Sequence, residues 1–451
     1  MNWRRQRRER GQALVLALLL VFIGLLALFF VFSAGQVAAT KARLTNAADA
    51  AAYSAALWRA RVLNFDAYAN RAIVAQEVAV AQALTLVSWS KYFEHFTQNA
   101  AVLAAAYPPL APVLDAAAKV ATQARTMTEV AAADEVFWRA AAGTGYKEIL
   151  QASQEMLQLS AGVFGAGAVA NEIARANDPS FFAYALTDAG EFERFTRRYA
   201  SDPDRERIRD IVLRSLDPFT SGPRSEDQIL WLLPSSCVLS FNDLSAWFQL
   251  FRKRGGTVLT PGLERWEAAD TASMHDNRRS GFLGLSCRRR ELVPLGWGAV
   301  ESGSPKAGTI LANPGNVAAN PAALAAAVAE IGGAGLPGLD SYGGISRVRE
   351  LNYEGLANRR FPTSPLAVLA RVEHKAVRTA NTLNLGTGRL RLFERFAGER
   401  IWALAAAEVY FRRPPDAGQG TEYASLYSPY WQARLAEPSV AQREAAESYV
   451  H

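Results

Sequence analysis

The chain has 451 residues, of which half are hydrophobic and a fifth are charged, so a chain disordered throughout is excluded. Two cysteines and four histidines argue against a disulfide-dense scaffold, a four-cysteine zinc site and a histidine-rich metal enzyme. The net charge is +6, but residues 1–10 supply +4 of it through five arginines and one glutamate, so a nucleic-acid-binding surface is not indicated.

An apolar segment of 22 residues, Ala13 to Ala34, follows this basic tail. As a helix it spans about 33 Å, enough to cross a hydrocarbon core of about 30 Å. Because the arginines precede it, the positive-inside rule keeps residues 1–10 in the cytoplasm and sends the bulk of the chain into the periplasm. The alternative is a cleaved signal peptide: the apolar run is longer than usual for one, but the small residues that follow leave cleavage open.

The helix is predicted to continue beyond the membrane, because the chain from Gly35 to Arg61 has no proline and is rich in alanine. Small residues on this stretch let a neighbouring helix approach closely. The predicted docking face consists of Ala47, Ala48, Ala51, Ala52 and Ala55. Two interpretations stay open: the face packs on its own domain, or it receives another subunit.

Two blocks of this region, RGQALV at 10–15 and NAADAAAYSAA at 46–56, resemble the N-terminus of TadE/TadG-like proteins. These are components of the tight-adherence (Flp) type IV pilus machinery of bacteria. The resemblance covers about residues 7–60. It implies a single-pass inner-membrane protein that helps to assemble or anchor a pilus or a related secretion apparatus, with pilus or secretion subunits as partners. It implies neither enzymatic activity nor a cofactor.

Two features of the family are not carried over. Many TadG-like proteins have a metal site of the form Asp-x-Ser-x-Ser, which this sequence lacks, so no bound metal is expected. Type IV prepilins have a glutamate five residues after the glycine at which they are processed, whereas here Leu16 stands five residues after Gly11. Processing between Gly11 and Gln12 is therefore a hypothesis without that supporting carboxylate.

The remaining chain is predicted to be helical first and then rich in strands. Helices are expected over 60–107, 112–129, 134–160 and 201–216, with a proline turn at 108–112. Strands are expected over 263–275, 287–293, 296–300, 345–351, 366–375 and 400–412. In the last strand, alternation predicts that the face from Ile401 to Phe411 covers the core and that Trp402 lies on the opposite face.

This order predicts an α+β protein of the pilin-like plan, in which a long transmembrane helix continues into a helical periplasmic region followed by a mostly antiparallel sheet. The expected divisions are a cytoplasmic tail (1–11), a transmembrane helix (12–35), a helical region (36–216), a linker (217–227), a sheet domain (228–436) and a C-terminal tail (437–451).

Cys237 and Cys287 are the two cysteines, and in the oxidising periplasm they are predicted to form a disulfide. Other candidate chemistry is weak. Asp270, Ser273, His275 and Asp276 resemble hydrolase residues in type, but no Gly-x-Ser-x-Gly turn accompanies them. We therefore expect a membrane-anchored structural component of a Tad-like pilus that binds inner-membrane lipid and no small-molecule substrate. The alternatives are a minor pseudopilin resembling the K component of type II secretion, and a membrane-tethered periplasmic hydrolase.

Overall fold

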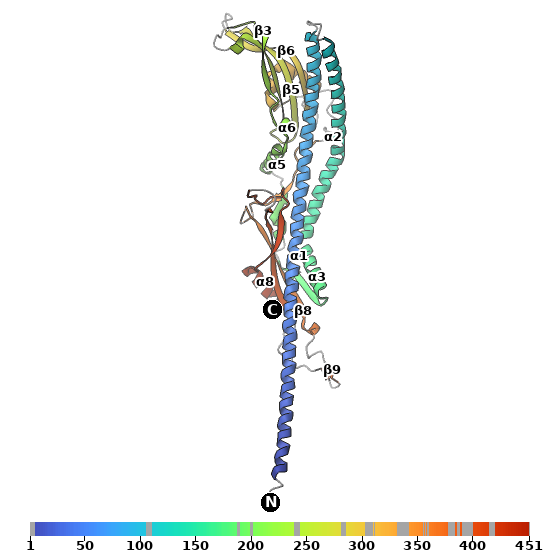
Figure 1. The fold of residues 1–451 in the computed structure, drawn as a ribbon, viewed down its shortest axis with the longest axis vertical. Helices are drawn as coiled ribbons and strands as arrows, with labels where there is room; N and C mark the ends of the chain where they lie inside the picture. Colours follow the sequence, from blue (N-terminus) through green and yellow to red (C-terminus); the bar gives the residue numbers. More distant parts are fainter. Residues whose placement is uncertain are drawn as a thin grey trace. The chain divides into compact units, whose positions relative to one another are not determined.

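The computed structural model confirms an α+β protein with a long N-terminal helix (Figure 1). It describes residues 5–104, 111–186, 190–198, 202–238, 244–280, 286–302, 310, 312–331, 342–354, 356, 358, 360–377, 384–385, 388–389, 400–414 and 420–450. The chain divides into two compact units. Unit 1 comprises Met1–Tyr68, Ser153–Arg197 and Glu350–His451, and unit 2 comprises Ala69–Ala152 and Arg198–Arg349.

Two helices contribute residues to both units: α1 (Arg5–Ala104) and α2 (Ala111–Ala161). Unit 1 adds α3 (Val163–Asn177), α4 (Glu191–Phe195), α8 (Val440–Val450) and a four-stranded antiparallel sheet with the order β1-β8-β11-β12. Its strands are β1 (Phe181–Ala185), β8 (Thr363–Glu373), β11 (Arg400–Phe411) and β12 (Trp431–Ala436). It also holds the short hairpin of β9 (Asn384–Leu385) and β10 (Gly388–Arg389).

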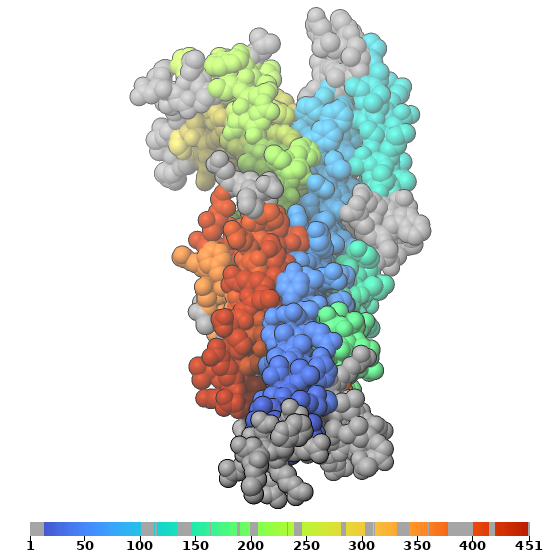
Figure 2. Space-filling model, turned by 60° about the horizontal axis from the view of Figure 1, so that its bottom comes forward, coloured from blue at the N-terminus to red at the C-terminus, as the bar shows by residue number. Residues whose placement is uncertain are grey.

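The core of unit 1 lies between one face of this sheet and residues 44–63 of α1 together with α3. Alternation in β11 buries Ala403, Ala405, Ala407, Val409 and Phe411, which confirms the predicted inner face. Small side chains dominate on both sides, so the helix lies close to the strands. Figure 2 shows the C-terminal segment, in red, directly against the blue α1.

Unit 2 contains a second antiparallel sheet with the order β3-β4-β5-β6. Its strands are β3 (Glu226–Pro234), β4 (Phe248–Leu259), β5 (Trp266–Ser280) and β6 (Ser286–Glu301), and its further helices are α5 (Asp202–Ser215), α6 (Pro218–Ser221) and α7 (Pro321–Ile331). The short strands β2 (Thr196–Arg198) and β7 (Arg349–Leu351) lie where the chain changes units.

Two glycines let α1 approach the unit 2 sheet. A Cβ atom on Gly298 would lie 2.2 Å from the carbonyl oxygen of Ser88, and one on Gly296 would lie 2.8 Å from the ring of Tyr92. Any larger residue at Gly298 would push the helix backbone away from β6.

The structure corrects three details of the expected elements. The predicted strands 287–293 and 296–300 are one strand, β6, because register shifts against β5 accommodate Pro294 without ending the strand. The helices expected over 112–129 and 134–160 are one helix, α2. The expected linker 217–227 contains α6 and the start of β3.

The division of the chain also differs from the expected one. Instead of a helical region followed by a sheet domain, each unit combines helices with its own four-stranded sheet. The reason is that an isolated helix or sheet leaves its apolar face uncovered, and each sheet is completed by helices from distant parts of the sequence.

Candidate functional site

The apolar segment of α1 carries the first candidate function, membrane anchoring. Sixteen large apolar side chains between Leu14 and Phe32 are 39–69 % exposed. Within the described part of the chain, α1 is the one helix long and apolar enough to cross a membrane, and no other part of the chain covers its apolar window. Leaving such a side chain in water costs about 1.5–3 kcal/mol relative to burial, so this segment requires an apolar surrounding.

The predicted docking face lies immediately beyond this segment. Ala47, Ala48, Ala51, Ala52 and Ala55 are fully buried in the core of unit 1. The structure thus gives these alanines the intramolecular role, the first of the two interpretations left open by the sequence, because the unit 1 sheet and α3 already occupy the space beside them. A surface for another subunit must use other side chains of the helix.

Polar bonds fix α1 to the unit 1 sheet at both ends of the alanine face. Near its start, Lys41 donates a hydrogen bond to the carbonyl oxygen of Trp402 in β11. Near its end, the amide of Asn64 donates to the carbonyl of Trp431 at 2.9 Å and accepts from the main-chain N–H of Trp431 at 3.0 Å. The helix is therefore bonded to two different strands of the sheet.

Arg59 is a fully buried cation between these bonds. Its guanidinium donates to the carbonyl of Ala161 at 3.1 Å and to the hydroxyl of Ser364 at 3.4 Å, and it lies 4.8 Å from the ring centre of Phe192. Burial lowers the pKa of Arg59 to about 10, and the charge of Glu191 opposes that shift. The sequence analysis missed this residue, because Arg61 follows two residues later and the sequence does not show which of the two arginines is buried.

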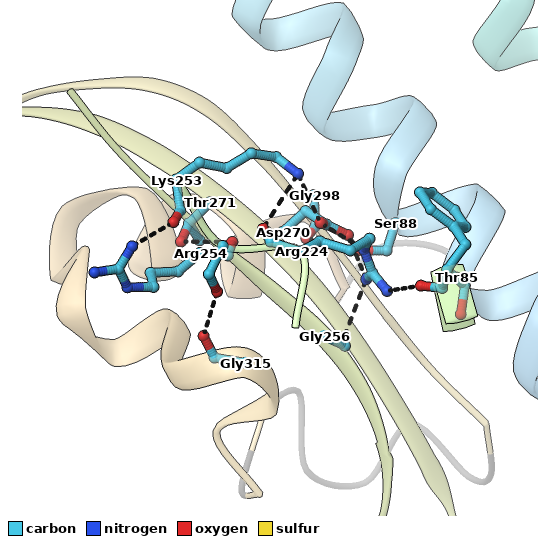
Figure 3. Close-up of polar contacts among 12 residues, drawn as sticks. Thr85, Ser88, Arg224, Lys253, Arg254, Gly256, Asp270, Thr271, Gly298 and Gly315 are labelled. Carbon is cyan, nitrogen blue, oxygen red and sulfur yellow. Dashed lines mark hydrogen bonds and ion pairs between the residues drawn. The ribbon is translucent and has the colours of Figure 1, made fainter. Parts of the chain in front are cut away.

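In unit 2, α1 is fixed by a buried ion cluster beneath the sheet (Figure 3). The carboxylate of Asp270 in β5 accepts from Arg224 at 2.7 and 2.9 Å and from the hydroxyl of Ser88 in α1 at 2.9 Å. Lys253 of β4 approaches the same carboxylate to 3.5 Å. Burial is the main cause of a lowered pKa at Lys253. Two cations on one carboxylate make this cluster sensitive to loss of Asp270.

A second buried carboxylate joins α1 to α2 and to the chain before β7. Glu77 is fully buried and accepts from Lys147 at 2.8 Å, from the Tyr342 hydroxyl at 2.6 Å and from the Ser346 hydroxyl at 3.2 Å. The charge is paired and hydrogen-bonded, as a buried carboxylate requires. It positions three segments of unit 2.

The residues weighed as parts of a hydrolase have structural partners. Asp270 belongs to the ion cluster, His275 bonds Asn320 at 2.7 Å, and Asp276 accepts from the main-chain N–H of Ser236 at 3.0 Å. Burial is the main cause of a lowered pKa at His275. Among the described residues, no group of three or more His, Cys, Asp or Glu side chains is arranged to hold a metal ion.

The two cysteines lie in unit 2, at the start of β6 and just after β3. The sulfur atoms of Cys237 and Cys287 are joined, with Cα atoms 5.8 Å apart, a separation at which disulfides form. Oxidation of this pair in the cell stays a prediction.

Gly11 and Gln12 lie within α1, and nothing is described of their side chains. Processing between them also stays a prediction, which the mass of the mature N-terminus decides.

Comparison with known families bears on this same region. Residues 11–60 match the Tad family model, described as Flp pilus-assembly TadE/G-like. No curated protein and no solved structure matches the chain. The match includes the whole apolar segment and the alanine face, and it ends beside Arg59. It confirms that the N-terminal region of this chain is similar to the TadE/G-like Flp pilus-assembly family.

Proposed function

We propose that this protein is a membrane-anchored structural component of a Tad-like (Flp) pilus or a related secretion apparatus. Its N-terminal tail lies in the cytoplasm and its two units lie in the periplasm of a bacterial cell. The observation that carries the proposal is the continuity of α1: the exposed apolar segment at 13–34 and the buried core residues 44–63 belong to one uninterrupted helix.

This continuity supports a mechanical role. A force on unit 1 reaches the bilayer through a helix that is bonded to the sheet at Lys41, Arg59 and Asn64, with no linker between the anchor and the folded part. A flexible tether would instead separate the two. The similarity of residues 11–60 to a pilus-assembly family supports the pilus as the structure in which the anchor serves.

Subunit contacts on α1 then use the side of the helix opposite the alanine face. Within unit 1 the exposed residues of α1 beyond the anchor include Asn46, Tyr53, Arg61 and Tyr68. Tyr53 and Tyr68 are 41 % and 61 % exposed, and large aromatic residues with a polar tip are favoured at protein interfaces.

Site-specific photocross-linking in native membranes tests the proposal. A photoreactive amino acid at Tyr53 or Tyr68 is expected to capture pilus or secretion subunits. The same reagent at Phe195, an aromatic residue buried in unit 1, is the matched control and should give only links within the chain. Capture of no pilus or secretion component from either tyrosine, in cells that assemble the apparatus, contradicts the proposed function.

A further inference from the structure

One end of the unit 1 sheet carries a row of aromatic side chains around an arginine. On the face away from the core, Phe182 of β1, Arg371 of β8 and Trp402 of β11 are direct cross-strand partners. The guanidinium carbon of Arg371 lies 5.8 Å from the ring centre of Phe182, 5.2 Å from that of Tyr184 and 5.9 Å from that of Trp402. We name Phe182, Tyr184, Arg371 and Trp402 the aromatic row.

The charge of Arg371 has no counter-ion in the described part of the chain. Arg371 makes no ion pair there, and its Nε is buried without a hydrogen-bond partner. Among the described residues, two carboxylates stand at this end of the unit, and each has its own arginine: Asp178 lies 3.9 Å from Arg43, and Glu373 lies 3.2 Å from Arg400. The aromatic row is therefore a cationic surface with apolar walls.

Two hydrogen bonds show where the end of the sheet that carries the aromatic row lies along α1. Lys41 bonds the carbonyl of Trp402, and Arg59 bonds Ser364 at the other end of β8. From Lys41 to Arg59 the helix rises about 27 Å, and the eight residues of β8 from Ser364 to Arg371 span about 23 Å. The strands thus run alongside α1, and the aromatic row is at the end nearest the apolar segment.

The distance from that segment puts the row near the membrane surface. Lys41 follows Ala34 by seven residues, or about 10 Å of helix, while the headgroup layer extends about 5–7 Å beyond the hydrocarbon core. Phe182 and Tyr184 are 36 % and 39 % exposed. Tryptophan and tyrosine favour the membrane–water interface, and arginine binds phosphate there.

We propose that the aromatic row binds the headgroups of anionic phospholipids in the bilayer that holds α1. Arg371 pairs with the lipid phosphate, and the rings of Phe182, Tyr184 and Trp402 lie against the outer part of the headgroup layer. Arg175, exposed and 5.8 Å from the ring of Phe182, adds positive charge beside the row. This inference rests on the proposed membrane anchoring and adds a second, lipid-selective contact made by the folded unit itself.

The test uses the full chain in nanodiscs of phosphatidylcholine with increasing fractions of phosphatidylglycerol, each containing a lipid with a nitroxide on its headgroup. The fluorescence of Trp402 is obtained as the difference between the chain and its Trp402→Phe variant. We expect quenching of Trp402 that grows with the phosphatidylglycerol fraction. Arg371→Gln should weaken the phosphatidylglycerol dependence about five-fold, the contribution of one basic residue near an anionic surface.

Arg434→Gln is the matched control. Arg434 also lies over a tyrosine, 4.6 Å from the ring of Tyr410, but it belongs to the opposite end of the same sheet. It should leave the quenching unchanged, and thermal unfolding of each variant shows whether unit 1 stays folded.

The outcomes separate this inference from the anchor. A chain that does not enter nanodiscs contradicts the proposed function itself. A chain that enters them with Trp402 unquenched, or quenched equally with and without phosphatidylglycerol, overturns the lipid assignment and leaves the anchor standing. Protection of Trp402 only when a periplasmic protein is added also overturns it, because the row would then be a protein-binding surface.

Discussion

The ammonium group of Lys41 donates a hydrogen bond to the main-chain carbonyl of Trp402, which stands 361 residues later in the sequence. Lys41 is the first charged residue after the apolar segment, and Trp402 belongs to one of the last strands. Burial lowers the pKa of Lys41. Unit 1 is thus completed by strands from the C-terminal part of the chain. One of them, β11, is hydrogen-bonded to α1 just beyond the apolar segment.

A charge at the centre of the apolar segment should release the protein from membranes. Ile23→Arg puts a guanidinium near the bilayer midplane, at a cost of about 2.5–3.5 kcal/mol. Alkaline extraction of isolated membranes measures the soluble fraction, which should rise for Ile23→Arg. Asn46→Arg adds the same charge outside the segment and should stay with the membrane. Equal retention of both variants would contradict the assigned segment.

Enlarging the alanine face should destabilise unit 1. Ala51→Leu inserts three carbon atoms between α1 and the sheet, and such overpacking costs about 1–3 kcal/mol. Thermal unfolding in detergent should show a lower midpoint for Ala51→Leu than for Asn46→Leu, which enlarges an exposed position of the same helix. An unchanged midpoint for Ala51→Leu would mean that the alanines face empty space rather than the core.

Loss of the central carboxylate of the ion cluster should strongly destabilise unit 2. Asp270→Asn leaves Arg224 and Lys253 buried with no negative partner, at a cost of about 3–5 kcal/mol. Asp227→Asn removes a carboxylate from a more exposed pair with Arg254 and should cost at most about 1 kcal/mol. Denaturant unfolding compares the two, and similar losses would contradict the difference in burial.

The cap of α6 should give unit 2 a stability that depends on acid pH. The hydrogen bond from Gln82, at 2.9 Å, is the largest cause that lowers the pKa of Asp217 to about 2, and hydrogen bonds from Thr220 add to it. Because the folded pKa lies below the ordinary value of 3.8, this carboxylate stabilises the fold above pH 3.8 and loses that effect as the pH falls toward about 2.

Asp217→Ala should therefore cost about 1 kcal/mol near neutral pH, the value of a helix cap, and nearly nothing at pH 2. Chemical unfolding at several pH values measures the difference. Asp217→Asn keeps a capping oxygen but does not titrate, so it should show less loss near neutral pH and a flatter acid dependence. A constant penalty for Asp217→Ala across this range would contradict the pKa assignment.

The cysteine pair should stabilise unit 2 under oxidising conditions. Closing a loop over a sequence separation of 50 residues contributes roughly 4 kcal/mol in the chain-entropy view. Protein isolated without reductant should contain no free thiol when unfolded, and Cys237→Ser should unfold at lower denaturant than the parent. In reducing agent the two should converge. Two reactive thiols in the unreduced protein would rule out the disulfide.

The sequence was informative where a pattern is local. The apolar run at 13–34 stands out because a charge within the hydrocarbon core is costly, and the inner face of β11 follows from strict alternation in an alanine-rich strand. The same locality misled at Pro294, which suggests a break between strands. There the extra residues form bulges against β5, and only the neighbouring strand reveals that β6 continues.

The residues that hold α1 in place were not predictable in this way. Arg59 pairs with groups more than 100 residues away, and Arg224 bonds Asp270, which stands 46 residues later in β5. The alanines at 47–55 allow close approach of any surface, so their pattern does not tell a sheet of the same chain from a helix of another. Which of these surfaces covers the alanines depends on contacts between residues far apart in the sequence, and no local pattern reveals those contacts.

Reporter cysteines in intact spheroplasts test the central claim most directly, since a membrane-impermeant maleimide reaches only the periplasmic side. In a bacterial host, a cysteine at Ser439 should react at once, and a cysteine at Gln6 should react only after the membrane is opened. Labelling of Gln6→Cys in intact spheroplasts, or protection of Ser439→Cys until lysis, would contradict an anchor that carries both units into the periplasm.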